Sequence, residues 1–176
     1  MPPSIVAVLV FGTMAVEAAR ARHNEAVQRA RGGIEPRGDV YPVMRIVYPA
    51  AFAAMIVEGA ARGGAPRATI VAGALVFGAA KALKWWAIVA LGESWTFRVI
   101  VVPGARLVSD GPYRFLRHPN YVGVIGELVG VALMTGAAVS GPLATIGFGL
   151  LIGKRIAVET RALRRYTESG KLTAES

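Results

Sequence analysis

The sequence predicts an all-α integral membrane protein with about five transmembrane helices, the last two forming a C-terminal helical hairpin. Hydrophobic residues make up 54% of the 176 residues. The mean hydropathy of +0.48 is too high for an ordinary soluble domain. The chain has no Cys and two His. This excludes disulfides and thiolate metal sites and argues against a His-rich metal centre, so we expect no bound metal.

Five apolar segments, each near the roughly 20 residues that span a bilayer, are the expected helices. They cover residues 4–19, 46–61, 68–91, 121–139 and 142–158. The first starts without a basic region ahead of it, so we expect a retained helix and not a cleaved signal peptide. The last is interrupted by Lys154 and Arg155, so its end is the least well defined by hydropathy.

The basic residues indicate how the chain is oriented. With five spans, the segments 20–45, 81–117 and 154–171 carry nearly all of the 20 Lys and Arg residues and lie on one side. Only Arg62 and Arg67 fall on the other side. Because Lys and Arg mark cytoplasmic loops, we expect an outside N-terminus in a bacterial inner membrane. The net charge of +9 lies in blocks between apolar stretches, which does not favour a nucleic acid partner.

The fourth and fifth segments are separated by a short turn at residues 140–142. Small residues at the spacing GxxxG let helix backbones approach closely in lipid. Two such pairs lie in this hairpin: Gly126 with Gly130, and Gly149 with Gly153. We expect this packing to return Arg155 and Glu159 to the depth of His118 and Tyr121.

A polar run, "SDGPYRFLRHPNYVG", precedes the fourth helix. Polar and charged residues near lipid are costly, which makes them functional candidates. Alternatively, Pro119 only starts the helix, and Asn120 and Tyr121 only sit in the headgroup belt. The density of the run around His118 favours a site, because backbone amides at a helix start can also receive an anion.

A second polar run, "KRIAVETRALRRY", follows the hairpin. Arg155 and Glu159 are four residues apart and therefore share a helix face. One interpretation is a snorkelling Arg in a weak helical ion pair. The other is functional: Arg155 holds an anionic substrate, and Glu159 holds a cationic or hydroxyl-bearing cofactor. Both runs would then meet in one site at the cytoplasmic face.

Other polar residues within the apolar segments have a less defined role. Glu127 is an intramembrane acid and thus a functional candidate, or else a protonated structural carboxyl or a partner for Lys154 or Arg155. We expect interfacial or structural roles for the rest. These are the anchors Trp85, Trp86 and Trp95, the snorkelling Lys81 and Lys84, and the structural Glu17 and Glu58.

The run "LVSDGPYRFLRHPNYVG", an apolar hairpin and then "RIAVETRAL" together resemble the isoprenylcysteine carboxyl methyltransferase family. That family has a G-x-Y-x-x-x-R-H-P-x-Y element, a helical hairpin and R-x-x-x-E. The resemblance covers about residues 91–166. The stretch "LGESWTFRVIVVPGARLVSDGPYRF" is most similar to bacterial members that accompany type III polyketide synthases and O-methylate alkylpyrones or alkylresorcinols.

The resemblance implies methyl transfer from S-adenosylmethionine to an oxygen on a lipophilic or lipidated acceptor, within one domain over residues 1–176. Three helices up to residue 91 would precede a cofactor-binding loop, the hairpin and a C-terminal segment in 92–176. By position, the cofactor residues are Ala105, Arg106, Leu107, Val108, Tyr113, His118, Pro119, Asn120, Tyr121 and Glu159. Arg155 would face the acceptor, and a phenolic acceptor would need Glu127 or His118 as base. The family's polar residue at the first cofactor position is Ala105 here, and the aromatic-rich tail is missing.

Two other functions fit parts of the sequence. The R-H-P-N-Y element also resembles membrane sterol reductases, which use NADPH and have more spans than this chain supplies. A non-enzymatic membrane module would treat both polar runs as interfacial decoration. The sequence leaves the acceptor and the oligomeric state open.

Overall fold

The computed structural model describes residues 1–105 and 108–172, and over these ranges the chain folds into five α-helices with no β-strand. The helices are α1 (Pro3–Ala30), α2 (Tyr41–Ala61), α3 (Arg67–Leu91), α4 (Pro119–Thr135) and α5 (Ser140–Leu172). Two short 3-10 helices, η1 (Gly92–Ser94) and η2 (Gly111–Arg114), lie in the long connection between α3 and α4. The predicted all-α class is confirmed.

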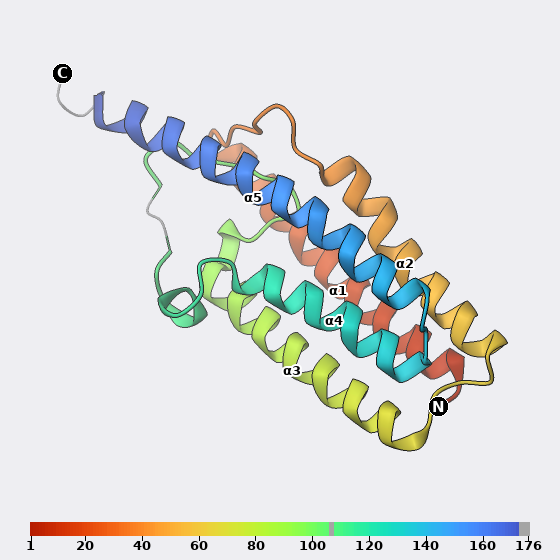
Figure 1. Cartoon of the computed structure of the whole chain (residues 1–176). Coiled ribbons are helices and arrows are strands. Elements are labelled where there is room, and N and C mark those ends of the chain that lie inside the picture. Colours follow the sequence, from red (N-terminus) through yellow and green to blue (C-terminus); the bar gives the residue numbers. More distant parts are fainter. Residues whose placement is uncertain (106–107, 173–176) are drawn as a thin grey trace.

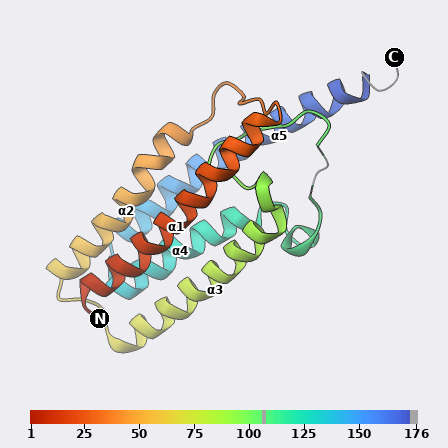
Figure 2. The ribbon, with the colours of Figure 1, turned by 180° about the vertical axis from the view of Figure 1, so that it is seen from behind.

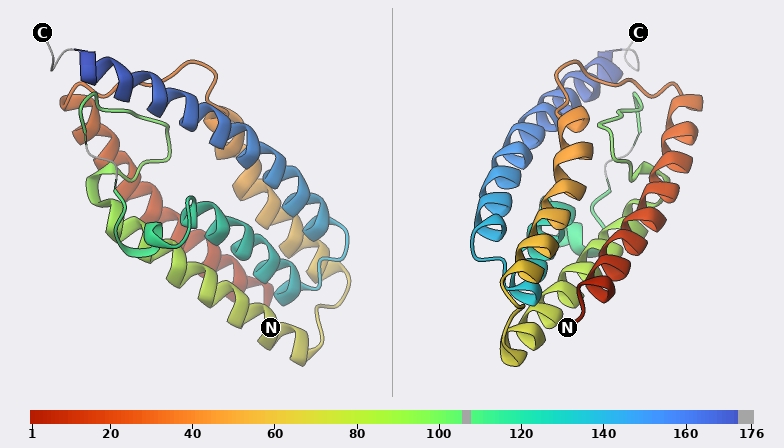
Figure 3. Two further views of the ribbon diagram at one scale, coloured as in Figure 1. Left: turned by 60° about the vertical axis from the view of Figure 1, so that its left-hand side comes forward. Right: turned by 90° about the vertical axis from the view of Figure 1, so that its right-hand side faces the viewer.

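The helices form an up-and-down bundle (Figures 1 and 2). One end carries the N-terminus, the α2–α3 connection and the α4–α5 turn. The opposite end carries the α1–α2 loop, the α3–α4 connection and the C-terminal part of α5, which extends beyond its neighbours (Figure 3). The three basic regions of the sequence therefore share one end, as five spans predict.

Length and apolarity make this an integral membrane protein. Among the described residues, α1, α2, α3 and α5 are long and apolar enough to cross a bilayer. Helix α4 is also apolar but has 17 residues. At 1.5 Å per residue it is about 25 Å long, shorter than the roughly 30 Å hydrocarbon core. Its polar first turn can therefore lie deeper than the ends of its neighbours.

Several predicted boundaries are corrected. Helix α1 continues to Ala30 because the residues after the apolar stretch include Ala, Arg, Glu and Gln, which favour helix in water as well. For the same reason α5 runs on to Leu172. Helix α4 ends at Thr135, earlier than hydropathy predicts, because Gly136 adopts a φ of 74° and its N–H caps Ala132 O at 2.9 Å.

A buried cluster of four charges joins α1, α3 and α4. Lys81 Nζ lies 2.7 Å from Glu17 Oε1 and 3.1 Å from Glu127 Oε2. Lys84 Nζ lies 2.7 Å from Glu17 Oε2 and 3.1 Å from Glu127 Oε1. From α2, the hydroxyl of Tyr48 donates to Glu127 Oε2 at 2.6 Å. Two positive and two negative charges thus balance inside the bundle, as burial away from water requires.

This cluster corrects two expectations. Lys81 and Lys84 do not snorkel to the surface, since the Lys84 side chain is 3% exposed and that of Lys81 is 11% exposed. The partners of Glu127 are these two lysines and not Lys154 or Arg155. Hydropathy could not reveal this, because a buried ion pair needs partners that are distant in the sequence.

The closest helix contact also differs from the expected one. A Cβ on Gly130 would lie 2.7 Å from Phe77 N, and one on Gly126 would lie 2.7 Å from Ala80 Cβ. Both glycines therefore bring α4 against α3. Such distances are far below van der Waals contact, so the backbones touch only because the side chains are absent.

The second glycine pair plays no such part. A Cβ on Gly149 would lie 3.9 Å from Ile125 Cδ1, an ordinary contact, and one on Gly153 would have nothing within 4 Å. The expectation that both pairs join α4 to α5 is wrong. The α4–α5 connection is instead held by Glu58 of α2, whose carboxylate accepts the N–H groups of Val139 at 3.0 Å and Ser140 at 2.7 Å.

We predict that Gly130→Ala destabilises the protein by about 1–3 kcal/mol, because its methyl group must push α3 away from α4. The matched variant Gly153→Ala should be neutral or slightly stabilising, since Ala favours helix and the position is open. Thermal unfolding in detergent micelles compares them. Equal unfolding midpoints for the two variants would contradict this packing.

We also predict that Lys84→Met costs about 3–5 kcal/mol of unfolding free energy, because it leaves the carboxylates of the cluster without full compensation. The control is Lys154→Met at an exposed position of α5, which should change stability by less than about 0.5 kcal/mol. The combined variant Lys84→Met, Glu127→Gln should recover part of the loss. A recovery of zero would mean that the two residues are not coupled.

Candidate active site

Arg155 of α5 is the centre of a polar network at the basic end of the bundle. Its side chain is 7% exposed. Its Nε donates to Tyr121 OH at 3.0 Å, and its Nη1 donates to Asp39 Oδ1 at 3.2 Å. Its Nη2 donates to the backbone carbonyl of Phe97. One guanidinium therefore joins α4, the α1–α2 loop and the α3–α4 connection.

Tyr121 links the two polar runs of the sequence. Its hydroxyl accepts from Arg155 and donates to Glu159 Oε2 at 2.9 Å. The rings of His118 and Tyr121 are 5.6 Å apart at their centroids and tilted by 30°. The expectation that the hairpin returns Arg155 and Glu159 to the depth of His118 and Tyr121 is confirmed.

Asp39 belongs to this network although sequence reasoning did not single it out. Its Oδ1 also accepts the N–H of Tyr41 at 3.1 Å, and its Oδ2 accepts the N–H of Val99 at 3.1 Å. In the sequence, an Asp two residues before a helix indicates only a local turn or cap. Its partner Arg155 lies 116 residues away, so no local pattern connects them.

The structure also corrects the expected role of Trp95. It is 3% exposed and is not an interfacial anchor. Its ring packs against Phe97 with centroids 5.3 Å apart, and its Nε1 donates to Asn120 Oδ1 at 3.2 Å. Asn120 therefore fastens the α3–α4 connection to the start of α4. Trp86, by contrast, is 50% exposed, as an interfacial residue would be.

Tyr113 lies in η2, outside the spanning helices. Burial, followed by the negative charge of Glu159, raises the pKa of its hydroxyl above the ordinary range. The hydroxyl therefore stays protonated at neutral pH and can act as a hydrogen-bond donor. Of the loop residues predicted before it, Ala105 is exposed and Val108 is half-buried. Arg106 and Leu107 lie outside the described residues.

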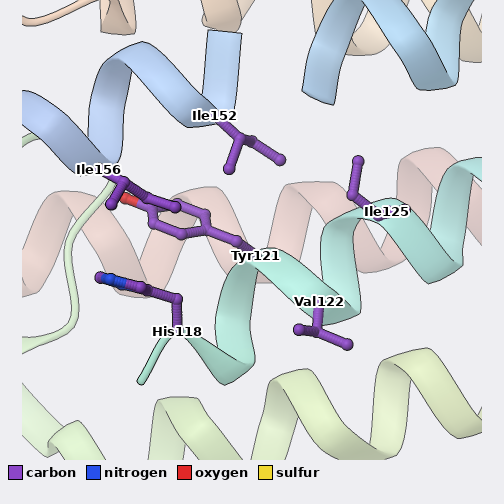
Figure 4. A pocket seen from close by; sticks show the side chains of 6 residues that line it. All are labelled: His118, Tyr121, Val122, Ile125, Ile152 and Ile156. Carbon is purple, nitrogen blue, oxygen red and sulfur yellow. The ribbon is translucent and has the colours of Figure 1, made fainter. Parts of the chain in front are cut away.

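An apolar cavity of about 330 Å³, largely open to the surroundings, lies between α4 and α5. It is lined by His118, Tyr121, Val122, Ile125, Ile152 and Ile156. Figure 4 shows the rings of His118 and Tyr121 beside Ile156, with the aliphatic side chains continuing along both helices. The polar network and the apolar cavity thus share Tyr121. Pro119 starts α4 directly after His118 and is itself buried.

Glu127 does not line this cavity. It is 1% exposed and lies in the cluster with Lys81 and Lys84 on the inner side of α4. Of the two candidate bases in the sequence, His118 lines the cavity, whereas Glu127 lies in the charge cluster inside the bundle.

The side chains around Glu159 suit a cationic ligand with hydroxyl groups. Glu159 supplies a carboxylate, and Tyr113, His118 and Tyr121 supply ring faces that can contact a cation. The charge of Arg155 is already balanced by Asp39, so it does not oppose a positive ligand beside Glu159. In the described ranges, no three His, Cys, Asp or Glu side chains gather as metal ligands.

Comparison with known proteins identifies relatives of this chain. The Bacillus subtilis (strain 168) uncharacterized protein YpbQ is 32% identical over 163 residues, covering 93% of this chain and 96% of that protein. A Haemophilus influenzae (strain Rd) uncharacterized protein is 26% identical over 143 residues, covering 81% and 83%. The search of solved structures found no match.

A probable protein-S-isoprenylcysteine O-methyltransferase from Oryza sativa subsp. indica is 34% identical over 86 residues, which cover 46% of this chain and 43% of the rice protein. The model of the isoprenylcysteine carboxyl methyltransferase family matches residues 71–165. This range is just over half of the chain and includes the cavity, Tyr121, Arg155 and Glu159. The chain therefore belongs to the isoprenylcysteine carboxyl methyltransferase family.

Proposed function

We propose that this protein transfers a methyl group from S-adenosylmethionine to an oxygen on a lipophilic acceptor. Family membership supports a membrane methyltransferase in general. One structural observation carries the more specific proposal. The hydrogen-bonded pair Tyr121 and Glu159 stands at the edge of an apolar cavity between α4 and α5. A polar cofactor and an apolar acceptor can therefore meet there.

On the cofactor side, Glu159 would accept hydrogen bonds from the cofactor or balance its positive charge. Tyr113 and Tyr121 would enclose it, and His118, Pro119 and Asn120 at the start of α4 would form the opposite wall. The segment from Ala105 to Val108, including Arg106 and Leu107, would complete the site by its position in the family pattern. This arrangement is supported by the position of Glu159, whose negative charge contributes to the raised pKa of Tyr113.

On the acceptor side, the aliphatic side chains of the cavity would take an alkyl or prenyl chain. Val122 is 51% exposed, and Val122, Ile125, Ile152 and Ile156 line the cavity from the apolar helices α4 and α5. Burial of a methylene group contributes about 0.8 kcal/mol, so chain length should affect binding strongly. The reactive oxygen would lie at the His118 and Tyr121 end.

The sulfonium of the bound cofactor supplies an activated methyl group, so the protein has to align the acceptor and manage its proton. Methyl transfer is an in-line displacement, and alignment alone can lower the barrier by several kcal/mol. A carboxylate acceptor is already ionised. A hydroxyl acceptor must lose its proton, and His118, which lines the cavity, is the proposed base.

The proposed acceptors are the hydroxyl of a long-chain alkylpyrone or alkylresorcinol and, as in the rice relative's name, an isoprenylcysteine carboxylate. The first choice follows the resemblance to bacterial members that accompany polyketide synthases. The site would face the cytoplasm of a bacterial inner membrane, because it lies at the basic end of the bundle and basic residues mark cytoplasmic loops. The cofactor would then enter from the cytoplasm and the acceptor from the bilayer.

Calorimetric titration of the detergent-purified protein with S-adenosylhomocysteine tests this function. We expect saturable binding, weakened roughly 10- to 100-fold by Glu159→Gln through loss of charge-assisted hydrogen bonds. The matched control is Glu93→Gln, since Glu93 is half-exposed at the same end of the bundle and pairs with Arg31. This variant should bind like the wild type. Folded protein that binds NADPH but no S-adenosylhomocysteine would contradict the proposal.

A further inference from the structure

We propose that Asp39 is a positioning residue that determines acceptor specificity. By occupying Arg155 it keeps this guanidinium from binding an acceptor carboxylate and so favours a hydroxyl acceptor. This inference rests on the proposed methyl transfer and deepens it. It also revises the sequence-based hypothesis that Arg155 binds an anionic acceptor directly.

The first argument is that Arg155 is already engaged, with three of its five N–H donors on oxygen atoms of the protein. All three of its nitrogens have partners within the protein: Tyr121 OH, Asp39 Oδ1 and Phe97 O. Guanidinium can bind a carboxylate through two parallel N–H groups, and here Asp39 takes one N–H of Nη1 while Tyr121 OH and Phe97 O take one each of the other two nitrogens. A second carboxylate that bound through parallel N–H groups would compete with these partners.

The second argument is that Asp39 is held in place. Its carboxylate also accepts two backbone N–H groups, from Tyr41 and Val99, so both oxygens are engaged. The side chain is 5% exposed. Displacing it would break three hydrogen bonds and leave a buried carboxylate without its partner, which is strongly unfavourable.

The third argument is the charge balance of the site. The positive charge of Arg155 is offset by Asp39, whereas Glu159 adds a further negative charge on the other side of Tyr121. A cationic methyl donor suits this balance. An acceptor carboxylate would bring one more negative charge next to Glu159, while a neutral hydroxyl would not. The hydroxyl would give its proton to His118 as the new oxygen–methyl bond forms and the sulfur leaves as a neutral thioether.

Arg155 then acts through other residues. It orients the Tyr121 hydroxyl that bonds to Glu159, and with Asp39 it ties the loops before α2 and after α3 to α5. Removal of the Asp39 charge should therefore have two separable effects. It releases a positive charge toward the acceptor, and it loosens the orientation of Tyr121.

The test compares two acceptors with the full-length wild type and two variants, using S-adenosylmethionine as donor. One acceptor is an alkylresorcinol and the other is N-acetyl-S-farnesylcysteine, which carries a free carboxylate. We expect the wild type to prefer the resorcinol. In Asp39→Asn, kcat/KM should fall for the resorcinol and rise for the carboxylate, shifting their ratio roughly tenfold or more. Asp39→Glu keeps the charge and should keep the preference at a lower rate.

Opposite changes for the two acceptors separate this role from a merely structural one, because a loosened fold lowers both together. Equal losses in Asp39→Asn, or a wild type that prefers the carboxylate, would overturn the inference. If Asp39→Asn does not fold, the wild type and Asp39→Glu test the inference. Both should prefer the resorcinol, and a preference for the carboxylate would overturn the inference.

The outcome also distinguishes a failure of this inference from a failure of the proposed function. If S-adenosylhomocysteine does not bind to the folded wild type, the proposed function is wrong, and the inference that rests on it is wrong as well. If it binds but neither acceptor is methylated, titration with N-acetyl-S-farnesylcysteine decides. Binding to the wild type as tight as to Asp39→Asn would refute the role of Asp39, whereas tighter binding to the variant would support it.

Discussion

The need to pair every buried charge shapes this protein more than any other constraint. An unpaired ion in a low-dielectric interior costs several kcal/mol, and lipid offers no water to compensate. The lysines of α3 meet Glu17 and Glu127 inside the bundle, and Arg155 meets Asp39 at its basic end. These pairs join α1 to α3, α3 to α4, and α5 to the loops, so the same contacts that satisfy the charges also fix the helices.

The candidate active site depends on this arrangement. The glycine-mediated contact of α4 with α3 places one face of α4 against the charge cluster and leaves the other, with Tyr121 and Ile125, toward α5. Glu127 therefore lies in the charge cluster, while His118 and Tyr121 line the cavity. Because α4 is short, its polar first turn can lie at a depth where, under the proposed function, an apolar acceptor and a soluble cofactor would both reach it.

Hydropathy and motif spacing predict those features that depend on neighbouring residues. The five helices and the meeting of Tyr121, Arg155 and Glu159 follow from apolar runs and from a short turn within one hairpin. Partners distant in the sequence could not be predicted. Lys84 lies 67 residues from Glu17, and Asp39 lies 116 residues from Arg155. Snorkelling lysines and an interfacial Trp95 were each reasonable from the local sequence, and the tertiary contacts contradict both.

Photo-crosslinking with methyl-tritiated S-adenosylmethionine, followed by peptide mapping of the purified protein, tests most directly where the proposed chemistry occurs. We expect saturable labelling, blocked by S-adenosylhomocysteine, in peptides containing Tyr113 to Tyr121 or Glu159. A second cavity of about 280 Å³ at the opposite end, lined by Val6, Ile56 and Met134 among others, provides the contrast. Labelling confined to those peptides, or labelling that S-adenosylhomocysteine does not block, would contradict the account.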